Sequence, residues 1–315
     1  MSWIQISITT IKANTETAED CLFAQGALTV TLSDAADQPI LEPEPGQTPI
    51  WNDAIVTGLF PADVDTQLIQ AALESCLLNK VGMKIGTDGK APAATITHDI
   101  LEDQNWTRAW MEHYQPMQFG ERLWVCPWHL EPPDKSAVNL RLDPGLAFGT
   151  GTHPTTALCL RWLGNNISHN INEQRTLLDF GCGSGILAIA ARLLGLPRAD
   201  CVDIDPQALL ATRDNASANH VSENTHVFLP DHYNQQHHDS QYDIVAANIL
   251  SGPLAELAPE LAHHCKTGGD IILSGILQQQ ANTIRDVYSH YFDMDETVSD
   301  EDWVLLHGVR RHNVC

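Results

Sequence analysis

The sequence predicts an α/β protein in which a doubly wound, seven-stranded sheet follows a smaller α+β domain. Three observations lead to this prediction. The chain has 315 residues, which is enough for two domains. From about residue 176 onward, short apolar runs alternate with helical stretches, as is typical of parallel strands joined by helices. The first hundred residues follow another pattern, in which two strands stand in succession between two helices.

The N-terminal domain is predicted to comprise residues 1–102. Its elements, in chain order, are a strand at Trp3–Thr9, a helix at Thr15–Gln25, strands at Ala27–Leu32 and Ala54–Phe60, a helix at Val64–Leu78 and a strand at Thr95–Ile100. The order β-α-β-β-α-β is typical of a ferredoxin-like domain. A linker helix is predicted over residues 103–120, with Trp106 and Trp110 on one face.

The larger domain is predicted to comprise residues 121–315. Its strands are expected at Thr176–Phe180, Ala199–Ile204, His226–Leu229, Tyr242–Asn248, Asp270–Ser274, Phe292–Thr297 and Trp303–Val309, the last two forming a hairpin. Its helices are expected at Ser184–Leu194, Pro206–Asn219, Pro253–His264 and Gln278–Tyr288. Ligands of such a sheet bind at the carboxyl ends of its strands.

A glycine-rich turn after the first of these strands is the most informative feature of the chain. The apolar run Leu177–Phe180 leads into Gly181-Cys-Gly183-Ser-Gly185 and then into an apolar helix. Glycines let the backbone approach a bound group closely, and a helix N-terminus offers free N–H donors. Asp203 ends the next strand, where a carboxylate can accept hydrogen bonds from both hydroxyls of a ribose. The pattern predicts a ligand that contains a nucleoside.

Two residues around the turn distinguish between nucleoside ligands. Dinucleotide-binding turns carry a third glycine at the position that Ile186 occupies here. Asp179, two residues before the first glycine, would repel a pyrophosphate but can bind the ammonium group of an amino acid. Adenosine joined to an amino acid is S-adenosylmethionine. We therefore predict this cofactor, with Asp179, Gly181, Gly183 and Asp203 in its site.

The composition excludes several classes of protein. A net charge of −23 repels phosphate backbones, so we expect no direct nucleic-acid binding. The charge would attract a basic partner; the alternative is that it serves solubility alone. The chain contains no run of about eighteen apolar residues and no secretory signal, which predicts a cytoplasmic protein without a membrane span. Eight cysteines without a C-x-x-C pair fit a reducing compartment and predict neither a disulfide nor a zinc framework.

Two more segments should lie at the same edge of the sheet. After the glycine-rich stretch 143–153, Pro154 begins a helix whose N–H groups and hydroxyls at Thr155 and Thr156 could bind a small anion or carboxylate. The alternative there is a flexible loop with a capped helix. Asn248 ends the fourth strand, and its side-chain oxygen could accept hydrogen bonds from a substrate N–H and orient the nitrogen toward an electrophilic methyl group. The alternative is an asparagine that caps the next helix.

The fifteen histidines give weaker signals. They include the pairs His237-His238 and His263-His264, whose neighbouring side chains should point apart, so we expect no metal site. His153, in the glycine-rich stretch, is the one histidine that we consider as a catalytic candidate.

Residues 141–315 resemble the class I S-adenosylmethionine-dependent methyltransferases, which have a Rossmann-like fold. A more specific resemblance, to the ribosomal protein L-eleven methyltransferases (PrmA-type), rests on the segments Leu142–Thr156, Ala247–Leu250 and Gly120–Pro127 together with Trp106 and Trp110. The resemblance implies an N-terminal domain that recognises the ribosomal protein, a linker helix and a catalytic domain. We expect the protein to be a monomer. It implies that lysine side chains, the N-terminal amine or both are methylated. It also implies cofactor contacts at Thr156, Gly181, Asp203 and Asn248.

Three alternatives stay open. One is a class I methyltransferase that acts on a different protein or on a small-molecule nitrogen; a glutamine-modifying enzyme would follow Asn248 with two prolines and an aromatic residue, whereas Ile249-Leu250-Ser251 stands here. Another is an NAD-dependent dehydrogenase, which shares the ribose carboxylate but is disfavoured by Ile186. The last is a binding module with a vestigial cofactor site.

Overall fold

The computed structural model describes residues 2–36, 49–81, 95–101, 114–143, 151–167 and 174–312. The chain forms two compact units, Met1–Ala109 and Trp110–Cys315, and each has a hydrophobic core of its own. The division between the units falls inside the predicted linker. Within the described part of the chain, no helix is both long and apolar enough to cross a bilayer.

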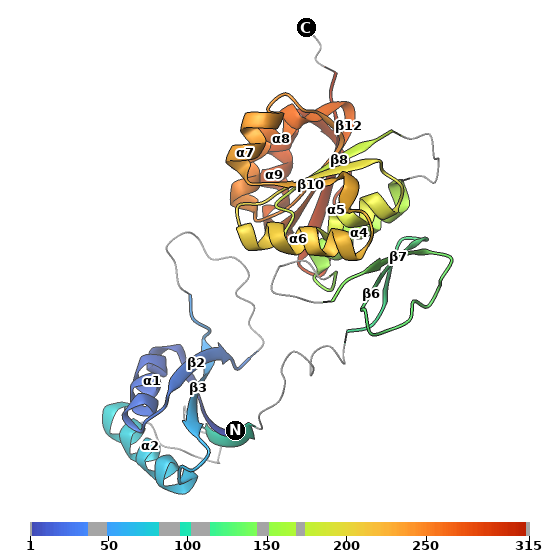
Figure 1. Ribbon diagram of the computed structural model, residues 1–315. Coiled ribbons are helices and arrows are strands. Elements are labelled where there is room, and N and C mark those ends of the chain that lie inside the picture. Colours follow the sequence, from blue (N-terminus) through green and yellow to red (C-terminus); the bar gives the residue numbers. More distant parts are fainter. Residues whose placement is uncertain are drawn as a thin grey trace. The chain divides into compact units, whose positions relative to one another are not determined.

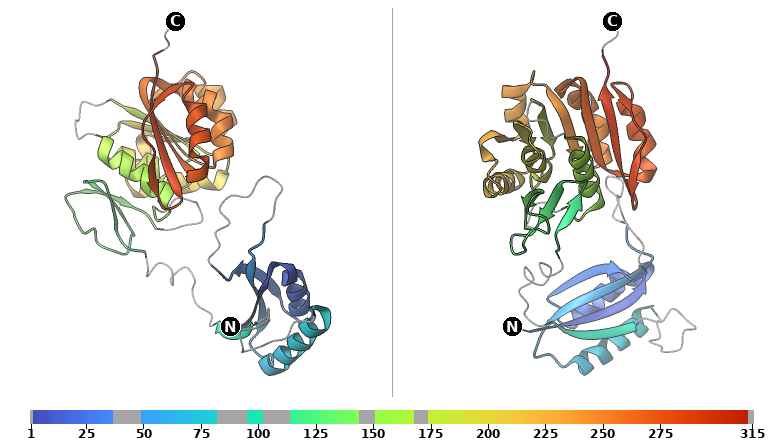
Figure 2. Two further views of the ribbon diagram at one scale, coloured as in Figure 1. Left: turned by 180° about the vertical axis from the view of Figure 1, so that it is seen from behind. Right: turned by 90° about the vertical axis from the view of Figure 1, so that its right-hand side faces the viewer.

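The N-terminal unit is a four-stranded antiparallel sheet with two helices on one face (Figures 1 and 2). Its elements are β1 (Trp3–Ile11), α1 (Thr15–Ala24), β2 (Thr29–Asp34), β3 (Asp53–Pro61), α2 (Thr66–Val81) and β4 (Thr95–Leu101). The strand order is β2-β3-β1-β4. Every second residue of β1 is buried, which places Ile4, Ile6 and Ile8 in the core with both helices. This is the predicted ferredoxin-like arrangement.

A disulfide joins the two helices of this unit, between Cys21 of α1 and Cys76 of α2, whose Cα atoms are 6.1 Å apart. The prediction that the chain has no disulfide is therefore wrong. It rested on the absence of closely spaced cysteine pairs, whereas these cysteines are 55 positions apart and only the packing of α1 on α2 brings them together. The other cysteines in the described ranges are free and buried.

The C-terminal unit is built on a doubly wound sheet. Its strands are β8 (Thr176–Phe180), β9 (Arg198–Val202), β10 (Thr225–Phe228), β11 (Tyr242–Asn248), β12 (Cys265–Leu277), β13 (Phe292–Met294), β14 (Val298–Asp300) and β15 (Trp303–Arg310). The order is β10-β9-β8-β11-β12-β15-β13, with the short β14 added on β15. The first five strands of this order are parallel, and β15 runs antiparallel to β12. From β8 the chain adds β9 and β10 on one side of the sheet and then crosses over to add β11 and β12 on the other side. Sheets of this kind bind ligands where the order changes, here between β8 and β11.

Helices cover both faces of this sheet (Figure 1). On one face lie α4 (Pro154–Asn166), α5 (Ile186–Leu193) and α6 (Pro206–Ala218), and on the other lie α7 (Pro230–His237), α8 (Ser251–His264) and α9 (Ala281–Tyr288). Strands buried on both sides explain the nearly continuous apolar sequence of β8 and β11. The carboxyl ends of β8, β9 and β11 therefore meet at one edge of a rigid core.

Two parts of this unit differ from the sequence prediction. The linker helix predicted over 103–120 does not reach residue 120, because Met117–Phe119 forms β5, which pairs with β6 (Leu123–Cys126). Together with β7 (Val138–Arg141) these strands make a small three-stranded sheet that was not predicted. Residues 102–113, with Trp106 and Trp110, lie outside the described residues. The polar segment around His237, where no helix was predicted, forms α7 and packs through the buried Tyr233.

Candidate active site

The glycine-rich turn after β8 adopts a backbone that requires its glycines. Gly181, Gly183 and Gly185 all have positive φ, at 79°, 55° and 77°. A Cβ atom on Gly181 would lie 2.2 Å from the side chain of Ile249, and one on Gly185 would lie 2.6 Å from the side chain of Thr212. The turn is therefore closely packed between the loop that follows β11 and helix α6.

Helix α6 fixes the turn by two hydrogen bonds that the sequence did not predict. Thr212 Oγ1 donates to the carbonyl of Gly183 at 3.0 Å, and Asn215 Nδ2 donates to the carbonyl of Ser184 at 2.9 Å. Thr212 is fully buried. Both side chains lie on the inner face of α6. The only sign of their role in the sequence is that they are polar residues on a helix face that packs against the core.

Asp203, which follows β9, also contacts the turn. Its Oδ2 accepts a hydrogen bond from the Gly183 N–H at 2.9 Å, and its Oδ1 accepts one from the Asp205 N–H at 2.9 Å. A carboxylate offers about four acceptor positions, so these two bonds leave capacity for ribose hydroxyls. The carboxylate thus links the turn to the end of β9 while it can still bind a ligand.

Asp179 is a buried carboxyl group with one unused oxygen. Its side chain is only 1% exposed; Oδ2 accepts the Ala188 N–H at 3.1 Å, and Oδ1 has no partner. Burial raises the pKa of Asp179 to about 7; the Ala188 N–H lowers it in part and the charge of Asp203 raises it further. A buried acceptor without a donor is costly, and such atoms are typical of ligand sites.

The structure brings Thr156 and Asn248 together at the same edge. Asn248 Nδ2 lies 3.3 Å from Thr156 Oγ1, in the first turn of α4, and Thr156 is fully buried. Asn248 Oδ1 is buried without a partner. Because the N-cap of α8 is Leu250, Asn248 does not cap that helix. Residues 144–150 of the glycine-rich stretch lie outside the described residues.

His153 is the N-cap of α4. Its Nδ1 lies 2.8 Å from Thr155 Oγ1 and 3.4 Å from the Thr155 N–H, and its ring packs edge-on against Trp303 at 5.0 Å between centroids. Burial lowers the pKa of His153. These contacts support a capping role for His153 instead of the catalytic role considered from the sequence.

Comparisons with known proteins show which family the chain belongs to. The model of the ribosomal protein L11 methyltransferase (PrmA) family matches residues 2–311. The chain belongs to this family. It is 47% identical to the ribosomal protein L11 methyltransferase of Hahella chejuensis over 310 residues, which cover 98% of this chain and 99% of that protein. It is also 47% identical to the one of Shewanella sp. over 314 residues, covering 99% of this chain and 100% of that protein.

A solved structure agrees with these PrmA relatives. The crystal structure of ribosomal protein L11 methylase from Lactobacillus delbrueckii subsp. bulgaricus matches with a TM-score of 0.54 and 32% sequence identity, covering 63% of this chain and all of that chain (100%). Membership in the PrmA family confirms the resemblance found in the sequence. It does not favour the dehydrogenase, the other classes of methyltransferase substrate or the vestigial binding module.

Proposed function

We propose that this PrmA-family chain transfers methyl groups from S-adenosylmethionine to amino groups of ribosomal protein L11. The observation that carries the cofactor assignment is a buried oxygen without a donor, Asp179 Oδ1, near the end of β8. A buried acceptor in this position fits a ligand group with N–H donors and positive charge, and the ammonium group of S-adenosylmethionine meets this requirement. A second such oxygen, Asn248 Oδ1, ends the adjacent strand β11 and is left for the substrate. The names of the relatives support ribosomal protein L11 as the substrate.

Each site residue receives a role in this proposal. Asp179 binds the ammonium group of the cofactor, and Asp203 binds the ribose hydroxyls. Gly181 and Gly183 let the backbone pass close to the cofactor, which a side chain would prevent. Thr156 and Asn248 complete the site from α4 and β11. When bound, the cofactor supplies a methyl group on a cationic sulfur, which an amine takes up by in-line displacement.

The incoming amine must be neutral to react. A lysine with an ordinary pKa of about 10.4 costs roughly 4–5 kcal/mol to deprotonate at pH 7, and an N-terminal amine with a pKa near 8 costs about 1 kcal/mol. A carboxylate beside the amine would raise its pKa, whereas a neutral amide oxygen accepts its N–H without adding charge. We therefore assign Asn248 Oδ1 to the substrate amine. Lysine side chains, the N-terminal amine of L11 or both are the proposed targets.

The N-terminal unit and the overall charge support a protein substrate. The N-terminal unit has its own core, separate from the cofactor site, and in this proposal it binds L11. The chain carries 40 acidic and 17 basic residues, a balance that attracts basic proteins and repels RNA. The proposal is accordingly a cytoplasmic monomer that modifies L11 without binding nucleic acid or membrane.

Mass spectrometry tests this function directly. Purified L11 is incubated with the full chain and isotope-labelled S-adenosylmethionine, and its peptides are mapped. We expect labelled methyl groups on amines of L11 and none when the enzyme is omitted. If L11 gains no labelled methyl groups in the presence of the enzyme, the proposed substrate is wrong.

The variant Asn248→Ala tests the role of the amide. Since the amide would orient the amine in the transition state, we expect kcat to fall by about 100-fold, while the affinity for S-adenosylmethionine changes much less. Single-turnover kinetics and calorimetry measure the two quantities separately. An equal loss in both would make Asn248 a cofactor ligand only.

A further inference from the structure

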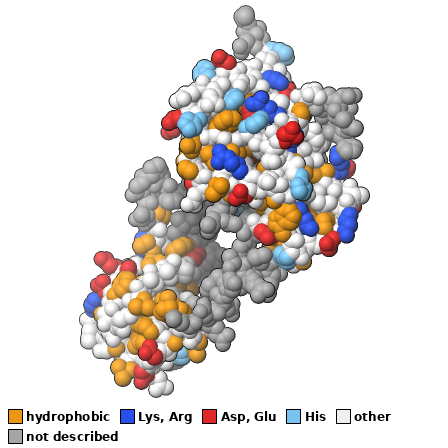
Figure 3. Space-filling model, in the orientation of Figure 1, with side chains coloured by type: hydrophobic (Ala, Val, Ile, Leu, Met, Phe, Trp, Pro, Cys, Tyr) orange, Lys and Arg blue, Asp and Glu red, His pale blue; other side chains and the backbone are white. Residues whose placement is uncertain are grey.

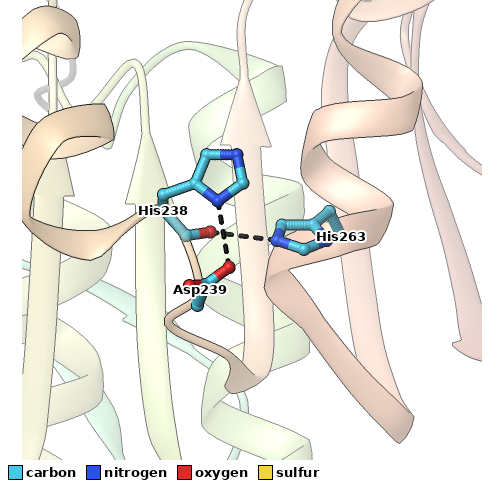
Figure 4. Close-up of side chains that lie close together, drawn as sticks. All are labelled: His238, Asp239 and His263. Atoms are coloured by element: carbon cyan, nitrogen blue, oxygen red, sulfur yellow. Dashed lines mark hydrogen bonds and ion pairs between the residues drawn. The ribbon is translucent and has the colours of Figure 1, made fainter.

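Two histidine pairs that are distant in the sequence meet on the surface of the C-terminal unit. His238 follows α7 and His263 lies in the last turn of α8, and their ring centroids are 5.2 Å apart. Asp239 lies beside them, with its Oδ1 3.0 Å from His238 Nδ1 (Figure 4). One ligand atom from each of the three residues lies within 4.8 Å of the others. We call these three residues the histidine cluster.

The chemistry of the histidine cluster suits a transition metal ion. Two imidazoles and one carboxylate, with further positions left to water, are a ligand set that Zn²⁺ and its neighbours in the first transition row accept. All three side chains are exposed, so an ion can enter from solvent. The cluster therefore offers one carboxylate oxygen and two imidazole nitrogens as ligands.

The backbone around the histidine cluster also favours a cation. The cluster lies at the C-termini of both α7 and α8, where the helix dipole has its negative end. In the space-filling view, histidines are exposed over the part of the unit where Figure 1 labels these helices (Figure 3). Two helix ends thus add to the attraction that Asp239 exerts on a cation.

Hydrogen bonds connect the segment after α7 to the end of α8. The Ser240 N–H donates to the His237 carbonyl at 2.9 Å, and His264 Nδ1 lies 2.9 Å from the Ser240 carbonyl. Gln241 Nε2 donates to the carbonyl of His263 at 3.2 Å. His263 Nε2 lies 3.0 Å from the His238 carbonyl, a contact that it can exchange for a metal bond. The segment that carries His238 and Asp239 is therefore fixed against the end of α8 before any ion binds.

We propose that His238, Asp239 and His263 form a binding site for a divalent transition metal ion that links the end of α7 to the end of α8. This site is separate from the proposed cofactor site. The cluster precedes β11, whereas Asn248 ends that strand, six residues after Tyr242. At about 3.3 Å per residue the strand separates them by roughly 20 Å. The metal would stabilise the fold and would not contact the cofactor.

Zn²⁺ titration of the full chain, freed of metal by a chelator, tests the proposal. We expect calorimetry to detect one Zn²⁺ per chain that is lost or weakened at least tenfold in each of the variants His238→Ala, Asp239→Ala and His263→Ala. His232→Ala is the matched control, since His232 is an exposed histidine of α7 outside the cluster, and it should bind Zn²⁺ like the original protein.

A second readout separates the site from other surface histidines. Zn²⁺ should raise the Tm of the original protein and of His232→Ala but not that of His263→Ala. All of these variants should bind S-adenosylmethionine as the original protein does, which shows that they are folded. The proposal is overturned if no Zn²⁺ binds, or if the three cluster variants retain the affinity of the control.

Discussion

Replacing Asp179 by asparagine should stabilise the protein at pH 8 and at the same time weaken its binding of S-adenosylmethionine. The pKa of Asp179 is raised from 3.8 to about 7 in the folded protein, mainly by burial. Between these two values the folded protein holds a proton that the unfolded chain has released, so stability falls as the pH rises through this range. At 1.36 kcal/mol per pH unit, the ionised carboxylate costs about 4 kcal/mol at pH 8.

Asparagine removes that charge but keeps a buried polar group without a partner, so we expect a net gain of about 2 kcal/mol. The gain should shrink at pH 5, where Asp179 is mostly protonated. Urea unfolding at the two pH values measures it. Asp214→Asn, at an exposed position on α6, is the matched control and should show no such pH dependence.

Cofactor binding should change in the opposite direction. Losing a charged hydrogen bond to the cofactor ammonium costs about 1.5–3 kcal/mol, or roughly 10- to 150-fold in Kd. Calorimetry with S-adenosylmethionine measures this loss. An Asp179→Asn protein that binds the cofactor normally would remove the proposed ammonium contact, and one that is less stable at pH 8 would contradict the cost of the buried charge.

The variant Asp203→Ala should also weaken S-adenosylmethionine binding by about 1.5–3 kcal/mol, the range for hydrogen bonds to a charged group. Two effects combine here, since Asp203 would bind the ribose and also accepts the Gly183 N–H that shapes the turn. Asp203→Asn retains one acceptor oxygen, so its loss should be smaller.

A ligand variant separates the two effects. An S-adenosylhomocysteine analogue that lacks the ribose hydroxyls should be bound almost equally by the original protein and by Asp203→Asn. Asp205→Ala is the control, because Asp205 caps α6 through the Gln207 N–H, and its loss should lower stability without changing cofactor affinity. If Asp203→Ala binds the complete cofactor with unchanged affinity, Asp203 is not the ribose ligand.

The sequence predicted the elements that depend on local pattern. The bounds of β8 and β11 were predicted without error, because apolar runs that end in a glycine turn or an asparagine leave little choice of register. The glycines of the turn were singled out before their positive φ angles were known. The sequence also predicted that Asp179, Asp203 and Asn248 lie at one edge of the sheet, because the carboxyl ends of parallel strands meet there.

Other features depend on contacts between distant segments and could not be predicted in this way. The Cys21–Cys76 disulfide joins two helices, and the histidine cluster joins the segment after α7 to the end of α8. The sequence does not state how these elements pack. Strands β5 and β7 are only three and four residues long, too short for a periodicity to show. Thr212 and Asn215 are polar residues on the inner face of α6, but only their hydrogen bonds to the glycine turn reveal their role.

A crystal structure of the full chain with S-adenosylhomocysteine would test the central claim most directly. The cofactor product should lie at the carboxyl ends of β8, β9 and β11, with its ammonium group on Asp179 Oδ1 and its ribose hydroxyls on Asp203. A product bound elsewhere, or bound there with both carboxylates out of hydrogen-bond reach, would contradict the account.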